Sequence, residues 1–230
     1  MKDILGEAVD DFQFNNQPGK LWIHNTYGPK EEMPVEAYFR EEDDMPDHEW
    51  LALNECRGRV LDVGAGAGSH ALLLQERGFD VTALDISHKS VEVMKTRGVK
   101  NAVQADIFGF TGEPFDTILL LMNGIGLAGT IDGLINLLRH LKTLLAPGGQ
   151  LLFDSSDVAY LYEGKVSEGE LSYYGEISYQ YEYKGLKTEW FKWLYIDEQK
   201  LAAIAQNEGW AMEVLLEDEH GQYLTRLTFA

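Results

Sequence analysis

The stretch VLDVGAGAG, residues 60–68, joins a short apolar run to three glycines at every second position. An apolar run that contains β-branched residues is typical of a buried parallel strand. The glycines lack a Cβ atom, so the backbone can turn tightly and a ligand can approach it closely. The chain then reads HALLLQERG, which predicts a helix that ends near Gly78. The stretch therefore predicts half of a βαβ unit whose turn binds a ligand.

The glycine spacing separates two kinds of nucleotide-binding turn. The dinucleotide fingerprint G-x-G-x-x-G needs its last glycine at position 69 or 71, where the chain has Ser69 and Ala71. The observed pattern is acid-x-G-x-G-x-G, from Asp62 to Gly68. It resembles the first motif of the S-adenosylmethionine (SAM)-dependent methyltransferases with a Rossmann-like fold, class I. For the loop alone, a tight βα turn that binds nothing is the alternative.

Two further carboxylates follow predicted strands. The alternating strand FDVTALDIS carries Asp85 near its end, and the next strand, NAVQADIF, is tipped by Asp106. Ligands of open α/β sheets bind at the carboxyl ends of the strands. The resemblance implies that Asp85 holds the two ribose hydroxyls of SAM, that Asp106 binds the adenine amino group, and that Ile107 covers the adenine ring. Helix capping is the alternative role for Asp85, although Ser87 is better placed for it.

The resemblance implies SAM as the cofactor, bound by residues at the ends of four successive strands: Asp62, Gly64, Ala65, Gly66, Gly68, Asp85, Ile86, Asp106, Ile107 and Asn123. Asn123 follows the apolar fourth strand FDTILLLM. Adenine and glutamine N-methyltransferases have an N/D-P-P-Y/F motif at this point, and the chain lacks its prolines and its aromatic residue. That departure argues against methylation of a base or a glutamine amide. Turn capping is the alternative role for Asn123.

The rest of the chain completes an α/β pattern. A leucine-rich helix from Thr130 ends at a Pro-Gly-Gly turn, the strand QLLFDSSD follows, and a helix from Asp197 leads into a last hairpin. We expect a Rossmann-like, seven-stranded, mostly parallel sheet with an antiparallel last strand. The predicted organisation is one domain, 1–230, with four parts: an N-terminal lid (1–55), a SAM-binding half (56–157), an antiparallel hairpin insertion (158–196) and a final helix and hairpin (197–230).

Candidate acceptor-site residues come from the lid, the fifth strand and the insertion: Tyr27, Arg40, Asp154, Tyr181 and Trp193. The lid is predicted to begin with a helix over residues 3–12 and to continue as an irregular segment over the core. Alternating aromatic residues in the insertion predict a hairpin face that roofs the active site. Simple surface packing is the alternative for the single residues. For the aromatic face, the alternatives are packing on the lid and a homodimer interface.

Composition limits the partners and the compartment. The net charge of −19 opposes binding to a phosphate backbone, so nucleic acid is an unfavourable substrate. The single cysteine, Cys56, rules out an intrachain disulfide and suits a reducing compartment. The first residues do not read as a signal peptide, and the apolar runs are too short to span a bilayer. We therefore expect a cytoplasmic protein without membrane contact, and the sequence shows no metal-binding cluster.

These features together predict a SAM-dependent methyltransferase with a small-molecule acceptor. Methyl transfer from a sulfonium needs little acid–base help because the leaving group is neutral, so no catalytic residue is assigned. The first alternative is a SAM-binding sensor or complex subunit that does not catalyse. The second, an NAD-dependent oxidoreductase, is disfavoured by the glycine spacing and by the lack of a Tyr-x-x-x-Lys pair.

Overall fold

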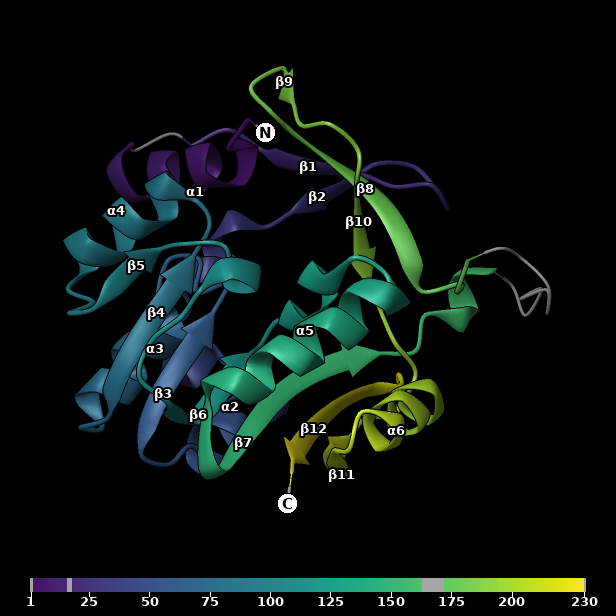
Figure 1. Ribbon diagram of the computed structural model, residues 1–230. Coiled ribbons are helices and arrows are strands. Elements are labelled where there is room, and N and C mark those ends of the chain that lie inside the picture. Colours follow the sequence, from purple (N-terminus) through teal and green to yellow (C-terminus); the bar gives the residue numbers. More distant parts are fainter. Residues whose placement is uncertain (1, 16–17, 163–171, 230) are drawn as a thin grey trace.

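The computed structural model describes residues 2–15, 18–162 and 172–229 (Figure 1). Its large sheet contains β3 (Arg59–Val63), β4 (Asp80–Asp85), β5 (Ala102–Gln104), β6 (Phe115–Leu120), β7 (Leu145–Ser156), β11 (Ala211–Glu217) and β12 (Gln222–Thr228). The strand order is β11-β12-β7-β6-β3-β4-β5. The pairs from β7 to β5 are parallel, and β12 is antiparallel to both of its neighbours. The predicted Rossmann-like α/β fold is confirmed.

Helices cover both faces of this sheet. One face carries α2 (Asp47–Glu55), α3 (Ser69–Glu76) and α4 (His88–Arg97), and the other carries α5 (Ile131–Leu144) and α6 (Glu198–Asn207). Alternate residues of the strands face the two layers, with Val60 packed on the α2–α4 side and Leu61 on the α5 side. A stripe of leucines on α5 is fully buried: Leu134, Leu137, Leu138 and Leu141. Burial on both faces explains why the central strands are mostly apolar.

Helix ends follow the predicted signals. The Thr130 hydroxyl accepts a hydrogen bond from Gly133 N at 3.0 Å, so α5 begins where expected. The Asp197 carboxylate accepts from Lys200 N at 2.9 Å and caps α6. Gly98 ends α4 in the left-handed conformation, φ +102°. These caps fix the lengths of the helices, and hence the ends of the strands beside them.

A second, antiparallel sheet has the order β10-β8-β1-β2, with β9 paired to β8. Its strands are β1 (Leu21–His24), β2 (Glu31–Met33), β8 (Glu176–Tyr183), β9 (Leu186–Lys187) and β10 (Phe191–Leu194). The pair β8 and β10 confirms the predicted hairpin, which turns at Lys184 and Gly185, both with positive φ. The prediction of an irregular segment is wrong at β1 and β2. The strand β1 pairs with β8, far along the chain, so local sequence does not reveal it.

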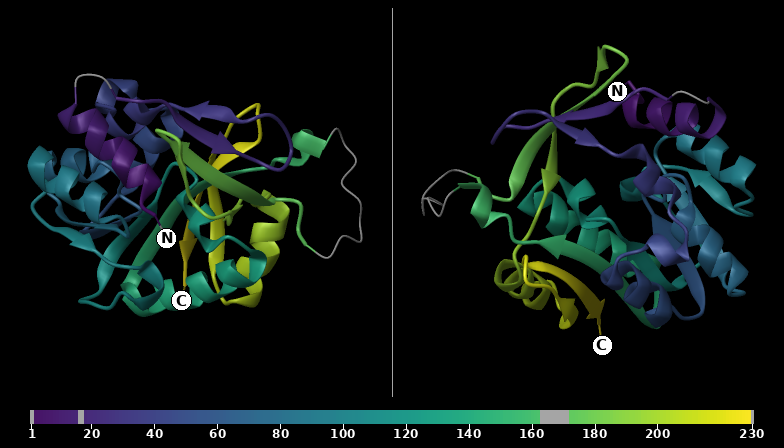
Figure 2. Two further views of the ribbon diagram at one scale, coloured as in Figure 1. Left: turned by 90° about the horizontal axis from the view of Figure 1, so that it is seen from above. Right: turned by 180° about the vertical axis from the view of Figure 1, so that it is seen from behind.

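The second sheet crosses above the carboxyl ends of the large sheet's strands (Figures 1 and 2). Beside it, α1 (Ile4–Phe14) packs on α4 and β8, which confirms the predicted first helix. Short 3-10 helices, η1 (Val35–Phe39) and η2 (Glu42–Asp44), lead from β2 to α2. Part of the predicted insertion, residues 163–171, lies outside the described residues. In the described ranges, no helix is both long and apolar enough to cross a membrane.

Candidate functional site

The three glycines of the β3–α3 loop have positive φ angles and different surroundings. At Gly64 (φ +72°), no atom of the described residues lies within 4 Å of the place that a Cβ would take. At Gly66 (φ +57°), a Cβ would lie 3.0 Å from Tyr38 Cδ1, and at Gly68 (φ +83°) it would lie 2.8 Å from Val99 Cγ2. Gly64 therefore faces open space, Gly66 lies beneath the ring of Tyr38, and Gly68 lets α3 pack closely on its neighbours.

Asp85 lies at the tip of β4, directly beside this loop. Its Oδ2 accepts a hydrogen bond from Gly66 N at 2.9 Å, and its Oδ1 accepts from Ser87 N at 2.8 Å. Burial raises the pKa of Asp85 to about 6, although both N–H groups favour the charged form. The Ser87 hydroxyl accepts from Ser90 N at 3.0 Å, so Ser87, not Asp85, caps α4. Next to Asp85, Ile86 is 70% exposed.

The third predicted carboxylate, Asp106, follows β5 at the same edge and is exposed. Its Oδ1 accepts from Phe108 N at 3.0 Å. Ile107 is packed in the core on the α5 side and is only 5% exposed, whereas Phe108 is 42% exposed. The adenine contacts of Asp106 and Ile107 stay predictions. The structure places Asp106 and the exposed Ile86 near one edge, since β4 and β5 are paired neighbours.

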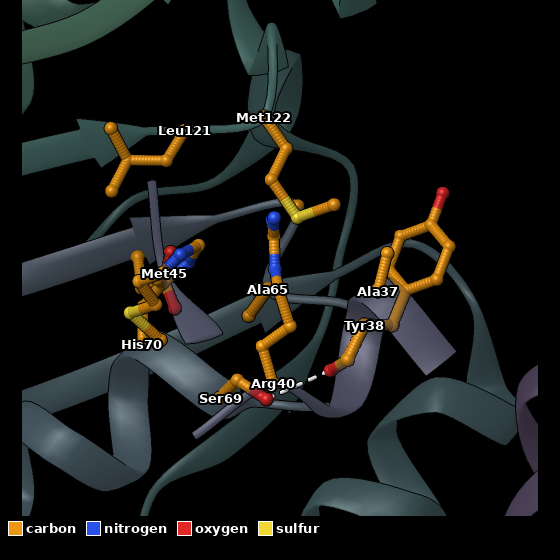
Figure 3. Close-up of a pocket in the computed structure, with 11 residues that line it drawn as sticks. Ala37, Tyr38, Arg40, Met45, Ala65, Ser69, His70, Leu121 and Met122 are labelled. Carbon is orange, nitrogen blue, oxygen red and sulfur yellow. Dashed lines mark hydrogen bonds between the residues drawn. The ribbon is translucent and has the colours of Figure 1, made fainter. Parts of the chain in front are cut away.

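A pocket opens beside the loop (Figure 3). Its lining comes from η1, the chain before α2, the β3–α3 loop and the tip of β6: Ala37, Tyr38, Arg40, Met45, Asp62, Gly64, Ala65, Ser69, His70, Leu121 and Met122. Figure 3 shows Arg40 reaching into the pocket, with His70 and Met45 on one side and Tyr38 on the other. The Ser69 hydroxyl donates to Tyr38 O at 2.8 Å, which ties η1 to the start of α3.

A buried carboxylate holds Arg40 in this place. Arg40 Nη2 donates to Glu49 Oε1 at 2.6 Å, and His70 Nε2 lies 2.8 Å from Glu49 Oε2. Burial opposes the charged form of Glu49, but the hydrogen bond from His70 and the charges of His70 and Arg40 hold its pKa below the ordinary value. Burial likewise opposes the charge of His70, and its bond to Glu49 raises its pKa. The three groups form a buried ionic cluster under the pocket.

Asp62 lies deeper and is incompletely paired. The residue is 2% exposed, and its Oδ2 has no hydrogen-bond partner among the described residues. Burial raises the pKa of Asp62, although the charge of His70 opposes the shift. A buried polar atom without a partner is costly and indicates a donor that a ligand supplies. The pocket thus combines one guanidinium group, from Arg40, with one carboxylate oxygen, Asp62 Oδ2, that lacks a donor.

The tip of β6 has strained backbone. Met122 and Asn123 both adopt the left-handed conformation, with φ of 59° and 54°; such conformations concentrate at functional sites. Asn123 N donates to Asp154 Oδ2 at 2.9 Å, and Asn123 Nδ2 donates to Leu194 O at 3.2 Å. Asn123 therefore joins the large sheet to the end of β10. Asp154 is fully buried and lines neither the first pocket nor the one beside Tyr27 and Tyr179.

The remaining acceptor candidates are spread over the second sheet. Tyr27 lines a second pocket, of about 310 Å³, together with Tyr179 and Tyr195. Tyr181 packs in the cluster beneath α1. The indole of Trp193 lies against the loop after β6, since a Cβ on Gly126 would lie 2.0 Å from Trp193 Nε1. The structure therefore brings Arg40 to the first pocket and Tyr27 to the second, and gives Tyr181 and Trp193 packing contacts.

Sequence reasoning missed Glu49, His70, Met45 and Met122. No local pattern marks them, because they come from separate elements and meet only at the first pocket. The sequence did place Glu49 and His70 on predicted helices near the glycine loop, but such residues are also common in proteins without a ligand site there.

Comparison with known proteins decides the family. A family model described as a methyltransferase domain matches residues 39–230. The chain belongs to this methyltransferase family. The structure is similar to a SAM-dependent methyltransferase from Bacteroides fragilis solved in complex with S-adenosyl-L-homocysteine (SAH). The identity is 44%, the TM-score is 0.92, and the match covers 100% of this chain and 95% of the other. The resemblance to class I methyltransferases is confirmed.

Two curated relatives match shorter stretches. The cypemycin N-terminal methyltransferase of Streptomyces sp is 33% identical over 104 residues, which cover 44% of this chain and 42% of the relative. The ubiquinone biosynthesis O-methyltransferase of Rickettsia akari (strain Hartford) is 30% identical over 89 residues, 36% of each chain. The matched stretches span less than half of these relatives. The two relatives are named for N- and O-methylation.

Proposed function

We propose that this methyltransferase transfers a methyl group from SAM to a small-molecule acceptor. The observation that carries the proposal is the charge pattern of the first pocket. The pocket brings the Arg40 guanidinium and the Asp62 oxygen that lacks a partner together beside the open side of Gly64. The methionine end of SAM carries one carboxylate and one ammonium group, which are the complements of these two side chains.

The residues along this edge of the sheet fit the whole cofactor. Arg40 would bind the methionine carboxylate, and Asp62 would accept from the ammonium group. Asp85, whose two oxygens already accept from Gly66 and Ser87, keeps further lone pairs for the two ribose hydroxyls. Asp106, exposed one strand farther along the edge, would accept from the adenine amino group. These roles run along the carboxyl edge from β3 to β5, where open α/β sheets bind ligands.

The chain contributes alignment and shielding. When bound, SAM supplies a methyl group on a sulfonium whose departure leaves a neutral thioether. Tyr38 and Met122 line the pocket and exclude water from it. Asn123 bonds the tip of β6 to Leu194 at the end of β10, which holds the donor pocket against the second sheet. Such positioning is sufficient for a reaction with a good nucleophile.

Two observations support a small acceptor. The second pocket, of about 310 Å³, lies within the size range of small-molecule sites. The net charge of −19 opposes a nucleic-acid substrate. The Bacteroides fragilis protein, similar over the whole length of this chain, was solved with SAH, which supports SAM as the donor.

Calorimetry with SAM and SAH tests the proposal. We expect both to bind, and Asp85→Ala to weaken both by about 1.5–3 kcal/mol, because charge-assisted hydrogen bonds are lost. Asp80→Ala is the matched control, since Asp80 begins the same strand and its side chain is 74% exposed. Unchanged affinity in a folded Asp85→Ala protein would remove Asp85 from the ribose site. Binding without turnover of SAM to SAH, in cell extract that supplies acceptors, would favour the non-catalytic alternative.

A further inference from the structure

The second pocket lies beside the donor site. Leu194 and Ile196, which flank Tyr195 in the chain, are fixed to the ends of β6 and β7. Leu194 O accepts from Asn123 Nδ2 at 3.2 Å, and Ile196 N donates to Ser155 Oγ at 3.0 Å. Tyr195 thereby reaches the second pocket from the carboxyl edge of the large sheet. Met33 and Pro34 line the second pocket and lead directly into η1, which carries Tyr38 of the first pocket, so the two pockets are neighbours.

Three tyrosines form walls at right angles in this pocket, and we call Tyr27, Tyr179 and Tyr195 the tyrosine box. The ring of Tyr179 makes an angle of 78° with that of Tyr27 and 79° with that of Tyr195, each at a centroid distance of 6.4 Å. The hydroxyl oxygens of Tyr27 and Tyr179 are 3.4 Å apart, and those of Tyr179 and Tyr195 are 3.3 Å apart. Rings set in this way offer electron-rich faces from more than one direction.

The charge around the box is negative. Among the residues described, those that line the pocket include Glu31 and Glu32 and no Lys, Arg or His. Glu32 pairs with Lys20 at 2.6 Å, whereas Glu31 accepts from Asn25 Nδ2 at 3.0 Å and occurs in none of the ion pairs of the described residues. Burial raises the pKa of Tyr27, so its hydroxyl stays neutral. One carboxylate at the pocket thus lacks a cation.

We propose that the methyl acceptor carries a protonated amine and an apolar body, with the ammonium group held by the tyrosine box and Glu31. The inference rests on the proposed function, because it assigns the pocket to the acceptor of that reaction. An ammonium group over aromatic faces is attracted by their quadrupoles, and a carboxylate offsets its desolvation. An anionic acceptor would face Glu31 and the negative ring faces without a counter-ion. The apolar lining of Ile23, Val158 and Leu161 suits the body of the molecule.

Calorimetry with three probes of one shape tests this inference on the full chain saturated with SAH. The probes are phenethylamine (cation), 2-phenylethanol (neutral) and 3-phenylpropionate (anion). We expect the amine to bind about tenfold or more tightly than the anion, with the alcohol between them. Glu31→Gln should remove most of this preference. Glu32→Gln, which removes the same charge one residue away, should leave the ratio within about twofold because Glu32 is already paired with Lys20.

The outcomes separate this inference from the proposed function. Failure of SAH itself to bind would contradict the donor site. Binding of SAH together with an amine that binds no more tightly than the alcohol or the anion, or that does not bind, would overturn the amine assignment alone. Equal effects of Glu31→Gln and Glu32→Gln would also overturn it, since the preference would then reflect the overall charge of the protein.

Discussion

Asp85 titrates in a range that binding experiments can reach. The cost of burying its charge outweighs the two backbone N–H groups that bond to it, and its pKa is about 6. In the unfolded chain an aspartate titrates near pH 4. The folded protein without ligand therefore keeps this proton to a higher pH. The contribution of Asp85 to stability is complete below about pH 4 and declines as the pH rises through about 6.

The affinity for the cofactor should also depend on the protonation of Asp85, but it should increase as the pH rises. Ribose hydroxyls donate to the ionised carboxylate, so ligand binding lowers the pKa of Asp85 and releases a proton below about pH 6. We expect SAH to bind about tenfold more tightly at about pH 7.5 than at about pH 5, by the tenfold-per-unit rule of proton linkage. Calorimetry over this range measures it. Asp85→Asn should flatten the profile; a slope that persists would assign the titration to another group, such as His70.

The sequence was informative at this scale where a residue belongs to a motif. Asp62, Gly64 and Asp85 occur at spacings that constrain their place at the strand ends, and they lie there. Arg40 could be proposed only as one of several polar groups in the lid. Its partner Glu49 could not be found, because a glutamate on a helix is ordinarily solvated, and only the fold shows that this one is 2% exposed.

At the scale of the element, the glycines of the β3–α3 loop have different roles. Gly64 faces the open side, where a ligand can approach, and Gly68 packs against neighbouring side chains. Gly64→Ala should fold, because its Cβ points into open space and only the positive φ, +72°, opposes it. It should weaken SAH binding, because this Cβ takes up space on the side from which a ligand approaches the backbone. Gly68→Ala should lower the melting temperature, because its Cβ would meet Val99 and Met94 at 2.8 and 2.9 Å. Gly66→Val should lose binding most, because it displaces the ring of Tyr38. Normal SAH affinity in Gly66→Val would show that the loop is misassigned.

The aromatic hairpin also acts as an element. Its register pairs Phe191 with Tyr179 and Trp193 with Ile177, so one face carries the rings. Tyr181→Leu and Trp193→Leu should lower stability by about 1–3 kcal/mol, because each ring fills a packed contact. Tyr179→Leu should reduce turnover, once an acceptor is known, with SAH binding intact. Sedimentation of each variant provides the control. A change in oligomer mass alone would identify a dimer interface and would contradict the prediction that this face covers the active site.

Periodicity explains why these elements could be foreseen and others could not. The hairpin of β8 and β10 and the helix α5 have strong local patterns and a turn or cap at each end. The strand β1 has four residues and β2 has three, and β1 owes its conformation to pairing with β8. A strand that depends on a distant partner leaves little local signal. The second sheet, and with it the second pocket, could therefore not be predicted as a unit.

At the scale of the molecule, buried charge ties the N-terminal segment to the large sheet. Glu49, on α2, bonds to Arg40 in the chain before it and to His70 on α3. Its neighbour His48 lies 3.9 Å from the buried Asp154 at the end of β7 and 3.0 Å from the Gln222 side chain on β12. The helix α2 thus connects the first pocket with β7 and β12, two neighbouring strands of the large sheet.

Removing the charge of Glu49 should weaken both the fold and the donor site. Glu49→Gln leaves the partly buried guanidinium of Arg40 and the buried imidazole of His70 without their carboxylate, so we expect the free energy of unfolding to fall by about 3 kcal/mol. SAH affinity should fall as well, because Arg40 loses its anchor. Glu55→Gln, on the same helix, breaks a partly exposed pair with Arg226 and should cost about 1 kcal/mol or less. Urea unfolding and calorimetry measure both effects.

The pH dependence of this loss distinguishes the ionic cluster from simple packing. The raised pKa of His70 stabilises the fold fully below its ordinary value near 6.5 and loses that effect as the pH rises through the folded value. The difference between the native protein and Glu49→Gln should therefore be larger at about pH 6 than at about pH 9. An equal loss at both pH values, or an equal loss in Glu55→Gln, would mean that Glu49 acts through its shape and not its charge.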